Sequence, residues 1–291
     1  MKRIALLLAL LAFAAVPARA QMNGITAELE LAQNQYLPDE DLQLKVKITN
    51  RSGQPVTFGQ VSNWITFHIV GERNYIAPVI SDMPITGEFT IDSGQTGWWK
   101  VNPTPFFDFR RIGHYRISAT LRIPAWNNIE ITCKPANFTV ANGLPLHGLA
   151  NLQFGVPPPP GVTNVAPEIR SYSLIKVAYL HELRLYFRLT DNTGRTLSVF
   201  PLSGMLSFSE PEAQMDRYNN LHVLMQTGAR SFTYSVVTPY GGLAERQTYD
   251  YSDTRPTLRS ADDGGIFVGG GYRRLAESDV PPPSTVSART Q

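Results

Sequence analysis

The sequence predicts an all-β protein that consists of two folded units. Apolar and polar residues alternate along many short runs, as they do in strands that bury one face. Turn residues separate these runs, and glycine and proline contribute 22 residues each. We find no convincing stretch in either unit with the i, i+3, i+4 and i+7 apolar spacing of an amphipathic helix. The hydrophobic share of 43% and the charged share of 17% exclude a disordered chain of high net charge and a coiled coil.

Residues 1–20 have the pattern of a secretory signal peptide. Lys2 and Arg3 give a positive start, an apolar run follows over 4–16, and Ala18-Arg19-Ala20 is a small-x-small cleavage site. The apolar run is shorter than the roughly 20 residues that a bilayer span requires, which favours a cleaved leader over the alternative of an uncleaved membrane anchor. We therefore expect an exported protein, periplasmic or extracellular, with no membrane span after cleavage.

The mature chain is expected to be nearly neutral and to lack disulfides. The leader carries three basic residues and no acid, so its removal changes the formal net charge from +2 to −1. This charge does not favour a nucleic-acid partner. Cys133 is the single cysteine, so no internal disulfide can form, and its phase with Ile129 and Ile131 predicts a buried position. Stability is therefore expected to come from burial of the core.

Residues 23–142 are predicted to form the first unit, an immunoglobulin-sized β-sandwich. Alternation predicts strands over 25–31, 42–48, 64–70, 115–123 and 129–140, and turn residues lie at 50–53 and 92–94. About seven short strands broken by turn signals are typical of a two-sheet sandwich.

Three features of this unit resemble an immunoglobulin-like domain of secreted bacterial proteins. The stretch 36–56, YLPDEDLQLKVKITNRSGQPV, is similar to the common opening of such domains, and Trp64 is similar in placement to their core tryptophan. Tyr115 resembles a tyrosine corner, which implies a hydrogen bond from its hydroxyl group to the backbone just upstream. Ile117 stands where antibody domains have cysteine, so the resemblance implies no inter-sheet disulfide. It implies a fold and says almost nothing about function.

Two stretches rich in proline or small polar residues predict segments outside the folded units. Residues 143–166 include Pro157–Pro160, which favours extended polyproline II and predicts a semi-rigid linker. Residues 276–291 have the composition of a disordered tail. These boundaries leave 167–275 as the second folded unit.

The second unit contains an internal repeat. Pro211–Val223 aligns without gaps with Pro256–Val268, and the leading proline, the turn pair and an apolar pair coincide in the two copies. A weaker copy begins at Pro167. A period near 45 residues resembles the blades of a β-propeller, although a closed propeller needs about four or more blades. The resemblance therefore implies a small propeller-like meander packed on itself.

We find no catalytic or metal-binding motif in the sequence. The histidines lack H-E-x-x-H spacing, Cys133 has no cysteine partner, and neither a G-x-S-x-G elbow nor a P-loop occurs. We therefore predict no catalytic residue, no metal and no cofactor. The acidic run Asp39-Glu40-Asp41 is compatible with a cation site by charge alone, but a solvated turn is favoured because the run lacks the ligand spacing of a calcium loop.

The candidate binding residues lie in the aromatic stretch Gly97–Arg111. Consecutive residues of a strand point to opposite faces, so about half of the aromatic side chains are expected to be exposed. Exposed aromatic and arginine side chains suit stacking on sugar rings or anchoring a protein partner. The alternative is that these aromatic side chains fill the sandwich core or the seam between the units. The predicted ligand-binding residues are Trp98, Trp99, Phe106, Phe107 and Arg110.

These features predict an exported, non-enzymatic binding or structural protein of the bacterial cell envelope. Its partner would be another envelope protein or a polysaccharide. Two alternatives stay open. One is a glycan-active enzyme with its cleft between the two units, and the other is an inhibitor of exported proteases, a role that some bacterial immunoglobulin-like domains have. The sequence favours a non-enzymatic role and leaves the ligand and the oligomeric state undecided.

Overall fold

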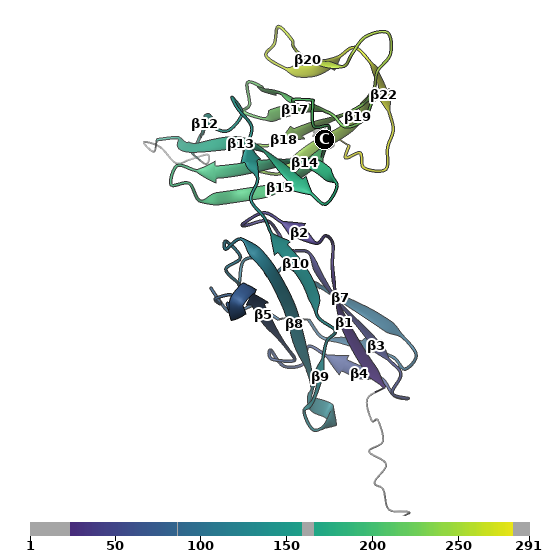
Figure 1. Cartoon of the computed structure of the whole chain (residues 1–291). Helices are drawn as coiled ribbons and strands as arrows, with labels where there is room; N and C mark the ends of the chain where they lie inside the picture. Colours follow the sequence, from purple (N-terminus) through teal and green to yellow (C-terminus); the bar gives the residue numbers. More distant parts are fainter. Residues whose placement is uncertain (1–23, 86, 159–165, 282–291) are drawn as a thin grey trace, which may run out of the picture.

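The computed structural model describes residues 24–85, 87–158 and 166–281, and this part of the chain is all-β (Figure 1). The regular elements besides strands are two short 3₁₀ helices, η1 (Glu72–Asn74) and η2 (Pro124–Trp126). The predicted fold class is therefore confirmed. Among the described residues, no helix has the length and apolar character needed to cross a membrane. The predicted leader over 1–20 lies outside the described residues.

Two larger sheets and one separate strand pair form the first unit. One sheet has the strand order β1-β3-β7 and the other has the order β2-β10-β8-β5, with β9 also paired to β8, while β4 and β6 pair with each other. The strands are β1 (Ile25–Leu31), β2 (Gln35–Tyr36), β3 (Leu44–Asn50), β4 (Val56–Phe58), β5 (Ile65–Gly71), β6 (Phe89–Ile91), β7 (Thr96–Val101), β8 (Gly113–Ile123), β9 (Ile129–Thr132) and β10 (Ala136–Val140).

Alternating side chains from both sheets meet in one hydrophobic core. Val46 and Ile48 on β3 and Ile117 and Leu121 on β8 are fully buried members of the same cluster, whereas the alternate residues Lys47, Ser118 and Thr120 face outward. Full burial of an aliphatic side chain of this size contributes about 1.5–3 kcal/mol. The alternation found in the sequence is therefore the pattern that places one face of each strand in the core.

Tyr115 and Trp64, the two side chains singled out in the sequence, both contribute to the first unit. The Tyr115 hydroxyl group donates a 2.6 Å hydrogen bond to the backbone carbonyl of Arg111, four residues upstream. Trp64 is completely buried beside Phe58. Cys133 is also buried, as predicted, and burial raises the pKa of its thiol to about 12, so the thiol stays protonated and unreactive near neutral pH.

Three layers form the second unit. The first sheet has the order β11-β13-β14-β15 with β12 also paired to β13, the second has the order β16-β17-β18-β19-β22, and β20 and β21 form a separate hairpin. The strands are β11 (Leu144–Pro145), β12 (Leu152–Val156), β13 (Glu168–Tyr179), β14 (Glu182–Asp191), β15 (Thr196–Met205), β16 (Glu212–Met215), β17 (Leu221–Gln226), β18 (Ser231–Val237), β19 (Leu243–Asp250), β20 (Thr257–Ser260), β21 (Ile266–Gly269) and β22 (Tyr272–Arg274).

Each layer buries apolar side chains against the preceding one. Leu221 and Val223 on β17 join the core of the first sheet, whose members include Phe187 on β14. Ile266 and Val268 on β21 pack against a second cluster on the opposite face of the β16-β17-β18-β19-β22 sheet. The hairpin therefore covers part of the outer face of the second sheet.

The internal repeat corresponds to a repeated hairpin. Glu212 pairs with Leu224 in the β16–β17 hairpin, and the residues 45 positions later, Thr257 and Gly269, pair in the β20–β21 hairpin. The same turn position is held by Asn219 with φ 64° and by Gly264 with φ 80°. In both hairpins this left-handed residue donates its backbone N–H to the carbonyl three residues upstream, of Asp216 and of Ala261 respectively. Whether these units are propeller-type repeats stays a prediction.

The predicted linker and tail boundaries need correction. Residues 144–156, assigned to the linker, form β11 and β12 on the edge of the first sheet, and Phe154 and Val156 are buried in its core. The reason is that LQFGV alternates like the other strands. The neighbouring prolines favoured a linker in the prediction, but this alternation decides the structure. In the predicted tail, Val280 pairs with Arg246 on β19. Residues 159–165 and 282–291 lie outside the described residues.

The two units contact each other directly. Leu37, in the loop after β2, is only 1% exposed and packs in a cluster with Val177 and Tyr186 of the second unit. The Gln35 side-chain amide donates a 2.7 Å hydrogen bond to the carbonyl of Ala178. Figure 1 shows β2 at the end of the first unit that adjoins the second. The junction therefore combines a buried apolar contact with a hydrogen bond from a side chain to the backbone.

Candidate functional site

The predicted aromatic residues divide between the surface and the core. Trp98 and Trp99 are consecutive in β7, and their side chains point to opposite faces of the sheet. Trp98 is 58% exposed. Trp99 is half-buried and lies edge to face against Trp64 in the core, with ring centroids 5.2 Å apart. Only the first of the pair is therefore available to a ligand.

The remaining predicted residues lie in the loop between β7 and β8. Phe107 is buried in the core, where it stacks against Phe109, and Phe106 is half-buried against the same core. Arg110 is exposed and forms a two-point contact with Asp108, with Nη2 2.6 Å from Oδ2 and Nε 3.0 Å from Oδ1. This hydrogen bonding lowers the pKa of Asp108. The exposed members of the set are thus Trp98 and Arg110.

Trp98 lies on a largely charged sheet face. Lys47 is its direct neighbour on β3, and Glu28 follows on β1. Lys47 Nζ is 2.8 Å from a carboxylate oxygen of Glu28 and 3.5 Å from one of Glu30. These partly exposed charges compensate one another. In the row formed by Trp98, Lys47 and Glu28, the tryptophan is therefore the side chain that exposes apolar surface to solvent.

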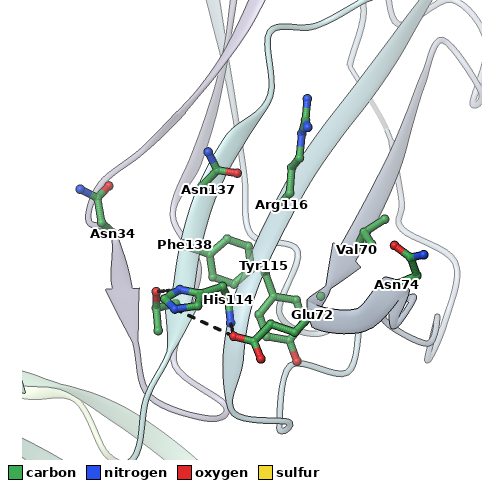
Figure 2. A pocket seen from close by; sticks show the side chains of 11 residues that line it. Asn34, Val70, Glu72, Asn74, His114, Tyr115, Arg116, Asn137 and Phe138 are labelled. Atoms are coloured by element: carbon green, nitrogen blue, oxygen red, sulfur yellow. Dashed lines mark hydrogen bonds and ion pairs between the residues drawn. The ribbon is translucent and has the colours of Figure 1, made fainter.

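A polar groove with a volume of about 960 Å³ lies on the opposite sheet (Figure 2). Its floor is formed where β5, β8 and β10 run side by side, and η1 and the turn before β2 supply its edges. The lining side chains that face outward are Asn34, Val70, Glu72, Asn74, His114, Arg116 and Asn137. Thr139, which alternates with the buried Phe138 and Val140 on β10, lines the groove as well.

Strand register places the polar side chains of the groove in rows. Arg116 on β8 lies between Val70 on β5 and Asn137 on β10. The intervening residues Tyr115 and Phe138 point into the core, where their rings stack 5.2 Å apart. The same alternation that fills the core therefore directs Arg116 and Asn137 to the solvent side.

Hydrogen bonds fix one end of the groove. His114 Nδ1 lies 2.8 Å from the Thr139 hydroxyl group, and the backbone N–H of His114 donates to Glu72 Oε1 at 3.2 Å. His114 Nε2 is 3.9 Å from the same carboxylate oxygen (Figure 2). These contacts tie η1 to β8 and β10, so this end of the groove is held by side chains from three elements.

Four other polar side chains have unused hydrogen-bonding capacity. Within 24–85, 87–158 and 166–281, the side chains of Arg116, Asn34, Asn74 and Asn137 make no hydrogen bond or ion pair with another residue. Each asparagine amide can donate and accept, and the guanidinium group donates in several directions. The groove thus presents a set of donors and acceptors that water or a polar ligand must satisfy.

The edge of the groove at η1 has a strained backbone. Arg73 has φ 54° and Asn74 has φ 59°, both in the left-handed region. Asparagine tolerates this conformation, but arginine adopts it rarely. The conformation is held by two backbone hydrogen bonds, one from the Gly71 N–H to the Tyr75 carbonyl and one from the Tyr75 N–H to the Glu72 carbonyl. Strain of this kind often occurs at functional sites, and here it orients Asn74 at the groove.

A second cleft, of about 400 Å³, lies between the two units. One wall carries the acidic run Asp39-Glu40-Asp41, and the other is formed by residues 197–201 of β15. Glu40 is 6% exposed, so the expectation of a solvated turn is wrong for this residue. Its carboxylate accepts hydrogen bonds from the Leu37 N–H at 2.8 Å and from Gln33 Nε2 at 2.6 Å. Burial raises the pKa of Glu40 to about 7.

Neither cleft offers a metal site in the part of the chain that the structure covers. Among those residues, no three histidine, cysteine, aspartate or glutamate side chains are grouped to hold a metal ion. Asp41 accepts a hydrogen bond from Asn102, and Glu40 is held as described, so two of the three acids of the run are engaged in protein contacts.

The groove residues were not identified from the sequence. Arg116 and Asn137 carry no motif, and the only available signal is that each alternates with a buried aromatic residue. Alternation predicts that they face outward, but it does not reveal that β8 and β10 are neighbours. The pairing of distant strands was therefore the missing information.

Comparison with known proteins identifies no family for this chain. No protein-family model matches it, and no curated protein matches it. One solved structure that aligns with it is the sporulation control protein Spo0M from Bacillus subtilis, at 13% sequence identity over 61% of this chain and 89% of that chain. The TM-score of 0.30 is too low for this likeness to support any conclusion about fold or function.

Proposed function

We propose that this protein is an exported, non-enzymatic binding protein of the bacterial envelope and that its polar groove binds a polysaccharide. The observation that carries the proposal is the row of unengaged side chains, centred on Arg116 and Asn137, on the outer face of the β2-β10-β8-β5 sheet. Support for export comes from the leader pattern over 1–20.

The chemistry of the groove suits a hydroxyl-rich chain. Sugar hydroxyl groups donate and accept hydrogen bonds, and the asparagine side chains at 34, 74 and 137 can do the same. A site for a small molecule normally encloses most of its ligand in an apolar pocket. This groove is instead open, is lined mainly by polar side chains and crosses three strands, which suits contact with several units of an extended polymer.

The cleft between the units gives less support to the glycan-active alternative. Glycoside hydrolysis normally requires two carboxyl groups on either side of the scissile bond. Here the acids come from one loop, and the facing wall of residues 197–201 contributes none. The Glu40 carboxylate already accepts hydrogen bonds on both oxygens. Binding in the groove is therefore the better supported function.

Binding of the mature chain to soluble polysaccharides tests the proposal. The panel would contain a neutral glucan, a uronic-acid polymer and solubilised peptidoglycan, with affinity measured by calorimetry and products analysed for hydrolysis. The double variant Arg116→Ala with Asn137→Ala removes two groove contacts. Because hydrogen bonds to charged groups contribute about 1.5–3 kcal/mol, affinity should fall at least tenfold.

Arg122→Ala is the matched control. Arg122 lies on the same strand and face but pairs with Glu130 at 2.8 Å, and it does not line the groove. Its removal should leave affinity unchanged. Failure of every polysaccharide to bind, equal binding by the double variant, or hydrolysis of a bound polymer would overturn the proposed function.

A further inference from the structure

The last hairpin of the second unit has one covered edge and one open edge. On the β20 side, the backbone N–H of Leu258 donates a 2.8 Å hydrogen bond to Glu212 Oε2, and Ser260 Oγ donates to Gln214 Oε1 at 3.2 Å. On the β21 side, the described residues contain no further strand, because β21 pairs with β20 alone. The two edges are therefore not equivalent.

The register of the hairpin shows which groups point to the open edge. The turn closes with a hydrogen bond from Ala261 N–H to the Gly265 carbonyl. Hydrogen-bonded and non-hydrogen-bonded pairs alternate along an antiparallel ladder, so Phe267 bonds to Arg259 across the hairpin. The N–H and C=O groups of Ile266 and Val268 consequently point away from β20, toward the open edge.

The first copy of the repeat shows what occupies the equivalent edge. Leu221 and Val223 correspond to Ile266 and Val268, and they pair with Val237 and Ser235 of β18. The edge of β17 is thus completed by an antiparallel strand, whereas no strand within 24–85, 87–158 or 166–281 completes the edge of β21. Edge strands are usually kept very short or are protected by charge, proline or a covering segment, and β21 is a short strand of four residues. The sequence of β21, Ile-Phe-Val-Gly, contains neither charge nor proline.

From this geometry we propose that β21 pairs with β21 of a second copy of the chain, antiparallel about a two-fold axis at Phe267. Ile266 then exchanges two hydrogen bonds with Val268 of the second copy, and the reverse pair forms by symmetry. Each outward N–H and C=O at these two residues gains a partner. Because β21 is complementary to itself in this register, one dimer contact provides hydrogen-bond partners for the open edge of both copies.

Side chains on the exposed face support a second copy as the occupant. Phe267 is 48% exposed, and the symmetric register places it directly opposite itself in a non-hydrogen-bonded pair, where cross-strand side chains are closest. Aromatic pairs at such positions are favourable. The same register sets Gly265 opposite Gly269 of the other copy, so no side chain at either end of the strand obstructs the approach.

The position of the hairpin permits such a dimer without covering the groove. In Figure 1 the β20–β21 hairpin lies at the end of the second unit that is remote from the first unit. A pair joined through β21 would therefore be elongated, with the two first units at opposite ends. Dimerisation and polysaccharide binding are thus independent, and either proposal can fail without the other.

Cysteine crosslinking tests the symmetric register. In the chain Phe267→Cys, two copies would hold their sulfur atoms directly opposite each other, and mild oxidation should give a disulfide-linked dimer. Arg259→Cys is the matched control, because it lies on the same face of the hairpin but one strand further from the axis. The native thiol, Cys133, is buried and should not interfere. Crosslinking at 267 with at least tenfold less at 259 is the expected result.

Sedimentation of otherwise native chains gives a second readout. The mass of the wild-type chain should rise with concentration toward twice that of the monomer. The variant Val268→Pro should stay monomeric, because proline removes an N–H that points to the open edge and leaves the hydrogen bonds to β20 intact. A wild-type chain that is monomeric at all concentrations, together with no crosslink at 267 or equal crosslinks at 267 and 259, would overturn the proposal and leave the edge to a strand of another protein.

Discussion

Trp64 and Trp99 pack edge to face with their ring centroids 5.2 Å apart, and this contact joins β7 to the residue that precedes β5 on the opposite sheet. Trp98, the neighbour of Trp99 in the chain, points away from it and is 58% exposed. Two adjacent residues of the same type therefore have different roles, one in packing between sheets and one at the surface.

Alanine substitution should separate these roles. Trp99→Ala removes a large side chain from the core and should destabilise the protein by about 2–4 kcal/mol, a little less than full burial would give. Trp98→Ala should change stability by less than about 0.5 kcal/mol, as is usual for surface sites. Urea unfolding of both variants checks the difference. Equal losses would show that Trp98 also contributes to packing.

The Tyr115 hydroxyl group should stabilise the crossing between the sheets. Its 2.6 Å hydrogen bond to Arg111 is the contact that the tyrosine-corner pattern predicts. Tyr115→Phe keeps the ring and should cost about 1 kcal/mol, observed as a lower melting temperature. Tyr218→Phe, at a side chain that is 63% exposed, is the control and should have little effect. Because burial raises the pKa of Tyr115 to about 12, its contribution should be constant from neutral pH to about pH 10.

Two glycines at the same turn position should differ in their tolerance of a side chain. Gly194 and Gly241 both have positive φ, at 83° and 80°. A Cβ atom at Gly194 would meet nothing within 4 Å, whereas one at Gly241 would lie 2.5 Å from the Cβ atom of Ser198. Gly194→Ala should therefore cost about 1 kcal/mol from the backbone alone, and Gly241→Ala clearly more. Thermal unfolding of both variants checks the order, and a reversed order would contradict it.

Local patterns predicted the strands well because alternation directly reports which face is buried. The run over 25–31 is β1, and the repeat at Pro211 and Pro256 begins two hairpins with the same register. Composition was a weaker guide. Prolines at 157–160 suggested a linker, but the preceding residues Leu152–Val156 pair with β13 because their alternating side chains fit its core.

Contacts between distant segments could not be predicted from one sequence. The groove depends on β8 lying between β5 and β10, and the burial of Glu40 depends on the second unit packing beside its loop. Phe107 looked suitable for binding because it is aromatic and near arginine, yet the core holds it. Residue type indicated what each side chain could do, and tertiary packing decided which of them reach the surface.

Glu40 should make the stability of the protein depend on pH. Its carboxyl group is buried at the junction with Arg184 as a nearby cation and Asp41 as a nearby anion, and burial raises its pKa from 4.5 to about 7. At pH values between 4.5 and about 7, the Glu40 carboxyl group is protonated in the folded protein and ionised in the unfolded chain. Stability should therefore fall as pH rises from 4.5 to 7, by on the order of 3 kcal/mol, and level off above.

Glu40→Gln should remove this slope, because the substituted side chain does not ionise. Urea unfolding at pH 5 and pH 8 provides the measurement, with the free energy of unfolding compared at the two values. Glu130→Gln, at an exposed side chain paired with Arg122, is the control and should retain the wild-type difference. If the free energy of unfolding of Glu40→Gln still fell between pH 5 and pH 8, the pH dependence would belong to other groups, because this variant lacks the ionisable carboxyl group at the junction.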